Sequence, residues 1–222
     1  MDVYVVNATS LVNACLAFEV SSGRFRPKSF DVAWEEMEKL RDRCEEPKEG
    51  EWIDLLLRAS EYPQVLEHVY VTLLFVDVPT FVMWQLTRHR HISWMVSSHR
   101  HSMVPPEPAI PESSRIDTRL EEAIRFAWRH GYRAYRLLIE DGYPKELARL
   151  VLPPVDSRVV LATGNLRAWL EMLCFRLNTN TQHETKMLLE KVLQRLNQVY
   201  TGLEKCFDRI CKNLYKHRAS FR

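Results

Sequence analysis

The feature that most constrains the fold of this chain is a stripe of apolar residues near its C-terminus. Between Thr181 and about His217 the stripe comprises Met187, Leu188, Val192, Leu193, Leu196, Val199, Tyr200, Leu203, Phe207, Ile210 and Leu214. Their recurrence with a period of 3.6 residues places them on one face of a helix. We therefore expect a long C-terminal helix, in which Gly202 is the point where it can bend.

The rest of the chain alternates between helical and strand-like patterns. Helices are predicted over residues 10–18, 30–43, 52–59, 80–88, 119–140, 144–150 and 165–177. Strands are predicted over residues 2–6, 69–78, 92–96 and 158–162. Because helices outnumber strands and the two are not regularly interleaved, we expect an α+β fold rather than a doubly wound one. The expected architecture is a single domain over residues 1–222, with an antiparallel sheet flanked by helices.

The composition is that of an ordinary globular chain. Its 222 residues include 46% hydrophobic and 27% charged residues, and the formal net charge is +2. A nearly neutral chain argues against general nucleic-acid binding, which favours a strongly basic domain. None of the six glycines forms a G-x-G-x-x-G or G-x-x-x-x-G-K loop. A bound nucleotide would therefore be held by side chains rather than by a glycine-rich loop.

The five cysteines suggest a reducing compartment. Their number is odd, and no C-x-x-C pair occurs among Cys15, Cys44, Cys174, Cys206 and Cys211. We therefore expect reduced thiols in an intracellular protein. The chain starts without a signal-peptide pattern and contains no run of eighteen apolar residues. The expected location is cytoplasmic, without a membrane segment.

A basic segment without acids indicates where function is concentrated. Residues 78–106 contain no Asp or Glu, although three arginines and four histidines lie between Arg88 and Ser102. Guanidinium groups pair with carboxylates or with phosphates. Where local carboxylates are missing, a bound anion is a candidate partner. The segment is therefore interpreted as a phosphate or nucleotide site.

The basic segment also admits other interpretations. The simplest is a solvated surface loop. The His89-x-His91 and His99-x-His101 spacings would suit a metal site, but neighbouring arginines would repel a cation, so we expect no metal. A nucleic-acid patch conflicts with the net charge.

A second cluster begins with the helix after residue 164. Thr163 or Asn165 can cap this helix. Arg167 and Arg176 are nine residues apart, which is about 180° of helical rotation. They cannot easily hold one small anion together. Either one arginine is structural, or the site is assembled between subunits. Upstream, Arg149 precedes an apolar segment and could instead pair with Glu146 or Asp156.

Together these motifs resemble the flavin-dependent thymidylate synthases. Arg88-His89-Arg90, seven residues, and Ser98 match the R-H-R-x7-S signature. Residues 79–85 resemble the lead-in helix of that family, including Gln85. Residues 149–153 resemble its A-R-x-V-L-P segment, and residues 165–184 resemble its N-x-R…L-R…Q-x-E helix. The likeness extends from about Glu61 to Glu184.

The resemblance implies a thymidylate synthase complementing protein-like fold, a homotetramer, and FAD shared between subunits. It also implies that dUMP is methylated at C5 to dTMP. Methylenetetrahydrofolate is the implied carbon donor, reduced FAD the hydride source, and NADPH the reductant of the flavin. No cysteine nucleophile is needed in that family.

The resemblance also assigns roles to residues. The implied flavin-binding residues are Arg88, His89, Arg90, Asn165, Arg167 and Glu171. The implied substrate-binding residues are Gln85, Arg88, Ser98, His99, Arg100, Arg149 and Arg176. Arg176 would face the pyrimidine and act in catalysis, because a cation there stabilises negative charge developing on the ring.

Several positions depart from the family pattern. Met95 and Val96 replace a common Asn-Glu pair whose acid touches the nucleotide. His99 replaces Gly or Ala, Glu171 and Asn180 replace Asn and His, and Ser60 begins an element that usually starts with His. These changes leave two alternatives open. The chain could methylate or hydroxymethylate another pyrimidine monophosphate such as dCMP, or it could be an inactive flavin- or nucleotide-binding homologue.

Overall fold

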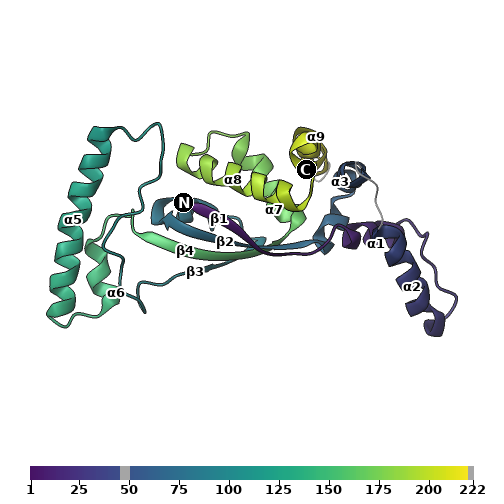
Figure 1. Ribbon diagram of the computed structural model, residues 1–222, viewed down its shortest axis with the longest axis horizontal. Coiled ribbons are helices and arrows are strands. Elements are labelled where there is room, and N and C mark those ends of the chain that lie inside the picture. Colours follow the sequence, from purple (N-terminus) through teal and green to yellow (C-terminus); the bar gives the residue numbers. More distant parts are fainter. Residues whose placement is uncertain (46–50, 220–222) are drawn as a thin grey trace. The chain divides into compact units, whose positions relative to one another are not determined.

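The computed structural model describes residues 1–45 and 51–219, and it shows an α+β fold (Figure 1). The strands are β1 (Asp2–Ala8), β2 (Tyr70–Pro79), β3 (Ile92–Val96) and β4 (Ser157–Asn165). The helices are α1 (Val12–Ser21), α2 (Phe30–Glu45), α3 (Glu51–Glu61), α4 (Thr80–Leu86), α5 (Thr118–Glu140), α6 (Lys145–Ala148), α7 (Leu166–Leu177), α8 (His183–Val199) and α9 (Leu203–Ala219). Short 3-10 turns occupy Pro63–His68 (η1) and Arg149–Val151 (η2). None of the described helices is both long enough and apolar enough to span a membrane.

The strands form one sheet in the order β1-β2-β4-β3. The amide of Thr80, just after β2, donates to the carbonyl of Asp156, just before β4. At the other end of the pair, the amide of Leu166 donates to the carbonyl of Val69. Opposite ends therefore meet, which makes β2 and β4 antiparallel, as predicted.

The burial of β2 explains its strand character. Val71, Leu73 and Phe75 alternate along the strand and are fully buried. The side chains between them are partly exposed, as the two-residue period of a strand requires. β-Branched and aromatic residues suit this half-buried surface.

The described chain divides into two compact units, each built from three stretches. The first contains Met1–Tyr4, Leu73–Ala162 and Asn180–Lys191. The second contains Val5–Thr72, Thr163–Thr179 and Val192–Arg222. In the first, α5 and α6 pack around a cluster of Val104, Trp128, Tyr135 and Ala148.

Side chains cap two of the described helices, and one of these caps, Asn165, was among the two candidates that the sequence offered. Asp117 caps α5, because its carboxylate accepts from the amide of Leu120 at 2.8 Å. Asn165 caps α7 by accepting from the amide of Ala168 at 2.9 Å. Thr163, the other candidate, instead shares a hydrogen bond with Thr72 through their hydroxyls.

The predicted long C-terminal helix is divided into α8 and α9. Gly202 lies in the turn between them with φ +92°, a conformation that glycine adopts without strain. A Cβ atom at Gly202 would also lie 2.5 Å from Cγ1 of Ile53. The apolar residues keep the same 3.6-residue period on both sides of this turn, so the sequence pattern does not reveal that the helix is interrupted.

The expectation of five reduced thiols is wrong in the structure. Cys15 is bonded to Cys44, and Cys174 on α7 is bonded to Cys211 on α9. Only Cys206 is free, and it is buried. Burial raises the pKa of the Cys206 thiol. None of the five cysteines, all of which are described, therefore offers an exposed nucleophilic thiolate.

Candidate functional site

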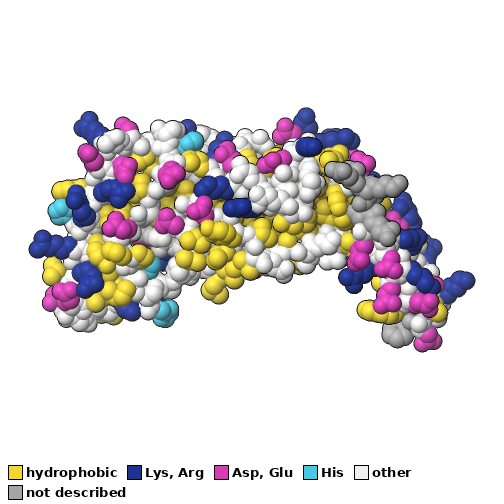
Figure 2. Space-filling view, viewed as in Figure 1, with side chains coloured by type: hydrophobic (Ala, Val, Ile, Leu, Met, Phe, Trp, Pro, Cys, Tyr) yellow, Lys and Arg dark blue, Asp and Glu magenta, His cyan; other side chains and the backbone are white. Residues whose placement is uncertain are grey.

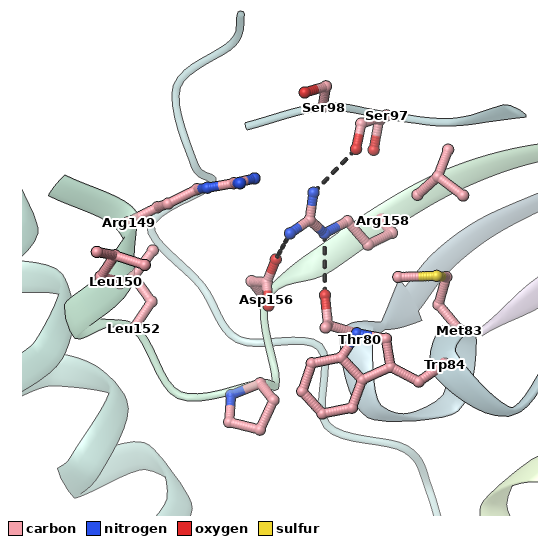
Figure 3. Close-up of a pocket in the computed structure, with 12 residues that line it drawn as sticks. Thr80, Met83, Trp84, Ser97, Ser98, Arg149, Leu150, Leu152, Asp156 and Arg158 are labelled. Atoms are coloured by element: carbon pink, nitrogen blue, oxygen red, sulfur yellow. Dashed lines mark hydrogen bonds and ion pairs between the residues drawn. The ribbon is translucent and has the colours of Figure 1, made fainter. Parts of the chain in front are cut away.

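The first unit contains a cavity of about 560 Å³ with a mixed apolar and charged lining (Figure 3). Its lining residues are Thr80, Met83, Trp84, Val96, Ser97, Ser98, Arg149, Leu150, Leu152, Pro154, Asp156 and Arg158. A cavity of this size matches typical small-molecule sites.

Four segments distant in sequence supply these side chains. The first turns of α4 carry Thr80, Met83 and Trp84. The end of β3 and the residues after it supply positions 96–98, and the turn η2 supplies Arg149. The start of β4 contributes Arg158. The antiparallel pairing of β2 with β4 brings the beginning of α4 beside Asp156.

Arg158 is held by contacts from three sides. Its Nε donates to Oγ1 of Thr80 at 2.9 Å, and Nη1 donates to the carbonyl of Ser97 at 2.9 Å. Its Nη2 lies 2.6 Å from Oδ2 of Asp156. The side chains of Arg158 and Asp156 are only 12% and 7% exposed. A buried pair of this kind fixes both groups in place.

His99 contacts the carboxylate of this pair. Its Nε2 is 3.2 Å from Oδ2 of Asp156, and its side chain is 4% exposed. Burial alone would raise the pKa of Asp156, but His99, Arg158 and Thr80 together outweigh it. The pKa of Asp156 therefore lies below its ordinary value, and the carboxylate is ionised at neutral pH.

Arg149 has no carboxylate partner in residues 1–45 and 51–219. The sequence offered Glu146 and Asp156 as its partners, but Glu146 pairs with Arg100 and Asp156 pairs with Arg158. The side chain of Arg149 extends into the cavity toward Arg158 (Figure 3). Two guanidinium groups thus face a space that contains one carboxylate.

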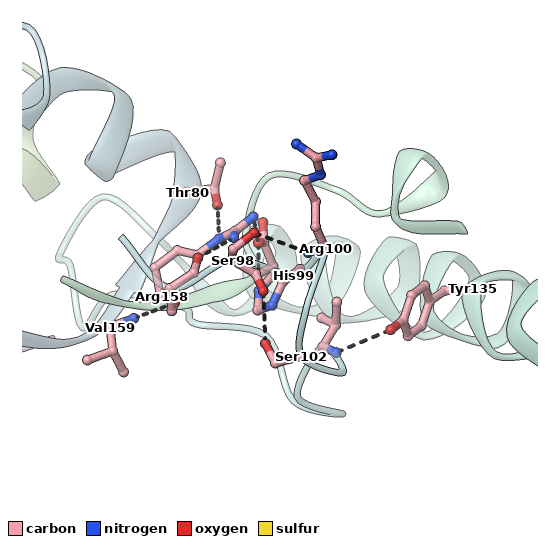
Figure 4. Close-up of polar contacts among 11 residues, drawn as sticks. Thr80, Ser98, His99, Arg100, Ser102, Tyr135, Arg158 and Val159 are labelled. Carbon is pink, nitrogen blue, oxygen red and sulfur yellow. Dashed lines mark hydrogen bonds and ion pairs between the residues drawn. The ribbon is translucent and has the colours of Figure 1, made fainter. Parts of the chain in front are cut away.

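The three arginines of the basic segment, Arg88, Arg90 and Arg100, lie outside the cavity lining. Arg100 forms an exposed ion pair with Glu146 at 3.0 Å, and its side chain points away from His99 and Arg158 (Figure 4). Arg88 and Arg90 are exposed, and neither forms an ion pair with another described residue. His99 and Arg100 therefore find acidic partners in distant parts of the sequence, whereas Arg88 and Arg90 find none among the described residues.

In the second unit, α7 carries the other group of predicted site residues. Arg167 donates from Nε to Glu171 at 3.0 Å and from Nη1 to Glu67 at 2.6 Å. Burial lowers the pKa of Arg167, but the two carboxylates outweigh this effect and raise it. Its positive charge is therefore already compensated. Arg176, at the other end of α7, lies with its guanidinium 5.6 Å from the ring centre of Phe175.

The structure brings together only part of the predicted substrate set. Ser98 and Arg149, from different motifs, line one cavity. Gln85, Arg88, His99 and Arg100 do not line it. Sequence reasoning missed Arg158 and Thr80 as cavity residues, and it considered Asp156 only as a partner of Arg149. The available signal was the Asp-x-Arg pair at the start of a predicted strand.

Comparison with known proteins adds a family match. A family model described as "Thymidylate synthase complementing protein" matches residues 5–200. The "Flavin-dependent thymidylate synthase" of Sulfurisphaera tokodaii is 33% identical over 156 residues, which are 68% of this chain and 59% of that protein. The protein of the same name from Pseudothermotoga lettingae is 30% identical over 163 residues, 69% of this chain and 73% of that protein. The alignments thus span between about three fifths and three quarters of the relatives' length.

Two solved structures share the fold. One is a UMP/dUMP methylase, PolB, from Streptomyces cacaoi bound with 5-Br dUMP, with a TM-score of 0.69 and 21% identity over 91% of this chain and 94% of that one. The other is Thymidylate Synthase X from Helicobacter pylori with FAD and dUMP, with a TM-score of 0.69 and 18% identity over 96% and 99%. At these identities the likeness concerns the fold alone.

Proposed function

Because this chain belongs to the thymidylate synthase complementing protein family, we propose that it is a flavin-dependent pyrimidine nucleotide methyltransferase. The proposed reaction converts dUMP to dTMP, with methylenetetrahydrofolate as carbon donor and NADPH as reductant of the flavin. We propose one domain over residues 1–222. The cysteines give no support to the expected cytoplasmic location, because four of the five are in disulfides.

The observation that carries this proposal is the convergence of two motifs on one cavity. Ser98 comes from the R-H-R-x7-S segment, and Arg149 comes from the A-R-x-V-L-P-like segment, fifty-one positions further on. A hydroxyl and a guanidinium that pairs with no carboxylate of the described residues are suitable donors to a phosphate monoester, which carries close to two negative charges. Relatives that are named flavin-dependent thymidylate synthases support the same assignment.

The residues present fit FAD in part. Arg88 and Arg90 are exposed and lack carboxylate partners within the described chain, which suits the anionic pyrophosphate of the cofactor. Arg167 is less suited as it stands, because Glu67 and Glu171 already neutralise it. It still has N–H groups that neither carboxylate uses. When bound, reduced FAD would supply the hydride.

The catalytic role belongs to Arg176 in this proposal. A guanidinium facing the pyrimidine stabilises the ionised form of the ring, whose negative charge makes C5 a stronger nucleophile toward the carbon donor. This activation does not require a thiol, and the chain has no exposed one, since Cys206 is buried and the other four cysteines are in disulfides.

A homotetramer accounts for two features of the chain. Met95, Val159 and Leu161 are 73%, 44% and 40% exposed, and Figure 2 shows hydrophobic side chains gathered over β3 and β4. Exposed apolar patches are typical of protein–protein contacts. Arg167 and Arg176 also diverge by about 180° on α7, so sites shared between protomers would give both a ligand.

Val96 favours one alternative substrate. It lines the cavity at a position where the resemblance places an acid that touches the nucleotide. Loss of that acid removes a hydrogen-bond acceptor, so a different pyrimidine monophosphate such as dCMP is the second candidate. The product could then carry a methyl or a hydroxymethyl group.

The test uses the full chain loaded with FAD. Protein is incubated with methylenetetrahydrofolate, NADPH and either dUMP or dCMP, and the nucleotide is analysed by mass spectrometry. Methylation of dUMP supports the first proposal, and modification of dCMP alone supports the second. A protein that retains flavin but changes neither nucleotide is a binding homologue, and both proposals are then wrong.

A further inference from the structure

Arg158 is a cavity residue to which the family resemblance gives no role. We propose that Arg158 binds the phosphate of the nucleotide together with Arg149, so that two guanidinium groups hold it. This inference rests on the proposed function and assigns a further specificity-determining residue to the same site.

The contacts of Arg158 leave donors available. A guanidinium group has five N–H bonds. Thr80 takes the one on Nε, the Ser97 carbonyl takes one on Nη1, and Asp156 faces Nη2. One N–H therefore remains on each terminal nitrogen. Both remaining N–H groups can donate to oxygens of a phosphate.

The charge balance of the cavity favours an anion. Arg149 and Arg158 carry two positive charges, and Asp156 is the one carboxylate among the lining residues. Burial lowers the pKa of Arg158, and the nearby charge of Arg149 lowers it further, against the opposing effect of Asp156. The two guanidinium groups therefore repel one another in the absence of an anion, and a dianionic phosphate would relieve this repulsion.

The position of Arg158 is fixed before any ligand arrives. Asp156 is itself held by His99, and all three side chains are at most 12% exposed. A donor that is already ordered loses little conformational freedom on binding. His99 and Asp156 are thus positioning residues, which act on the phosphate through Arg158.

The competing interpretation is that Arg158 only connects α4, the end of β3 and β4. A structural arginine would affect all ligands of the cavity alike, whereas a phosphate-binding arginine would affect only phosphorylated ones. The discriminating measurement is therefore the affinity for dUMP against that for deoxyuridine, which lacks the phosphate.

The experiment measures both affinities by calorimetry in FAD-loaded wild type, Arg158→Gln and Arg158→Lys. The matched control is Arg136→Gln, which removes an arginine of the same unit from an exposed pair with Glu140. We expect Arg158→Gln to weaken dUMP binding on the order of 10- to 100-fold and to leave deoxyuridine binding unchanged. Arg158→Lys, which retains the charge but loses the fork, should show a smaller loss confined to dUMP.

Other outcomes would overturn the inference. Arg158 would be a structural residue if either Arg158 variant lost affinity for dUMP and deoxyuridine equally. The same conclusion would follow if either variant lost no affinity for dUMP. If Arg158→Gln does not fold, the Arg158→Lys comparison decides alone. If wild type binds dUMP more tightly than deoxyuridine and Arg158→Gln keeps the same preference, only the role of Arg158 is contradicted. Wild-type protein without any preference for dUMP contradicts the proposed function itself.

Discussion

Nε2 of His99 lies 3.2 Å from Oδ2 of Asp156, and both side chains are almost completely buried. The resemblance places a Gly or Ala where this chain has His99, so the imidazole fills space that a small residue would leave. Its partner Asp156 also contacts Arg158 at 2.6 Å. A buried carboxylate between two such groups links the stability of the fold to pH.

Asp156→Asn should therefore flatten the acid dependence of stability. The pKa of Asp156 is lowered in the folded state, so its contribution is fully present above the unfolded pKa of about 3.9 and is lost as pH falls through the lower folded pKa. Urea unfolding between about pH 5 and pH 2, the range in which this contribution is lost, should show a smaller decline for the variant. At neutral pH the variant should be about 3–5 kcal/mol less stable, because a buried pair is broken.

The matched control is Asp141→Asn, because Asp141 is exposed at the end of α5. Its acid dependence should follow that of wild type. A variant of Asp156 whose stability declines with acid as steeply as wild type would show that this carboxylate does not contribute.

The two disulfides predict a specific thiol content. Five cysteines less the four in disulfides leave one, Cys206, so denatured unreduced protein should react with one equivalent of thiol reagent. Ala at both Cys174 and Cys211 should destabilise the fold by about 3–4 kcal/mol, through loss of the constraint on the unfolded chain. Five reactive thiols in protein purified without reductant would contradict the pairing.

Asn165 is expected to have two roles that can be separated. Its side chain caps α7 through the amide of Ala168, and the family resemblance places it against FAD. Asn165→Ala should lower the free energy of unfolding by about 1 kcal/mol. Asn165→Asp retains a capping oxygen and should be about as stable as wild type. FAD affinity, measured by flavin fluorescence, should fall in both variants. Full FAD affinity in Asn165→Asp would limit the residue to capping.

Arg176→Ala should lower the turnover number on the order of 10²- to 10³-fold, because one preorganised donor to the developing charge is lost. FAD retention should largely survive. Arg209→Ala, an exposed position on α9, serves as the control and should match wild type. Loss of flavin with unchanged activity per bound flavin would contradict the role given to Arg176.

Much of the fold follows from local sequence. The predicted helix over 119–140 differs from α5 by one residue, because Asp117 is a strong capping residue and the apolar period is uninterrupted. The four strands appeared as β-branched runs at the predicted positions. The sequence indicates a bend at Gly202, but the structure shows a full break, because Gly202 takes a φ of +92° and a Cβ atom there would lie 2.5 Å from Cγ1 of Ile53, a residue distant in sequence.

The site was less predictable because its contacts join distant segments. The basic segment contains no acid, yet Asp156 and Glu146 reach His99 and Arg100 from later parts of the chain. Arg158 was overlooked since a lone Asp-x-Arg resembles an ordinary surface pair. The disulfides were missed because pairing cannot be deduced from spacing, and the odd cysteine count favoured free thiols.

The most direct test follows the carbon atom. FAD-loaded protein is supplied with NADPH, dUMP and methylenetetrahydrofolate whose methylene carbon is isotopically labelled, and the nucleotide is analysed by mass spectrometry and NMR. The proposed reaction yields dTMP with the label in its C5 methyl group. Flavin-loaded protein that leaves both dUMP and dCMP unlabelled under these conditions would contradict it.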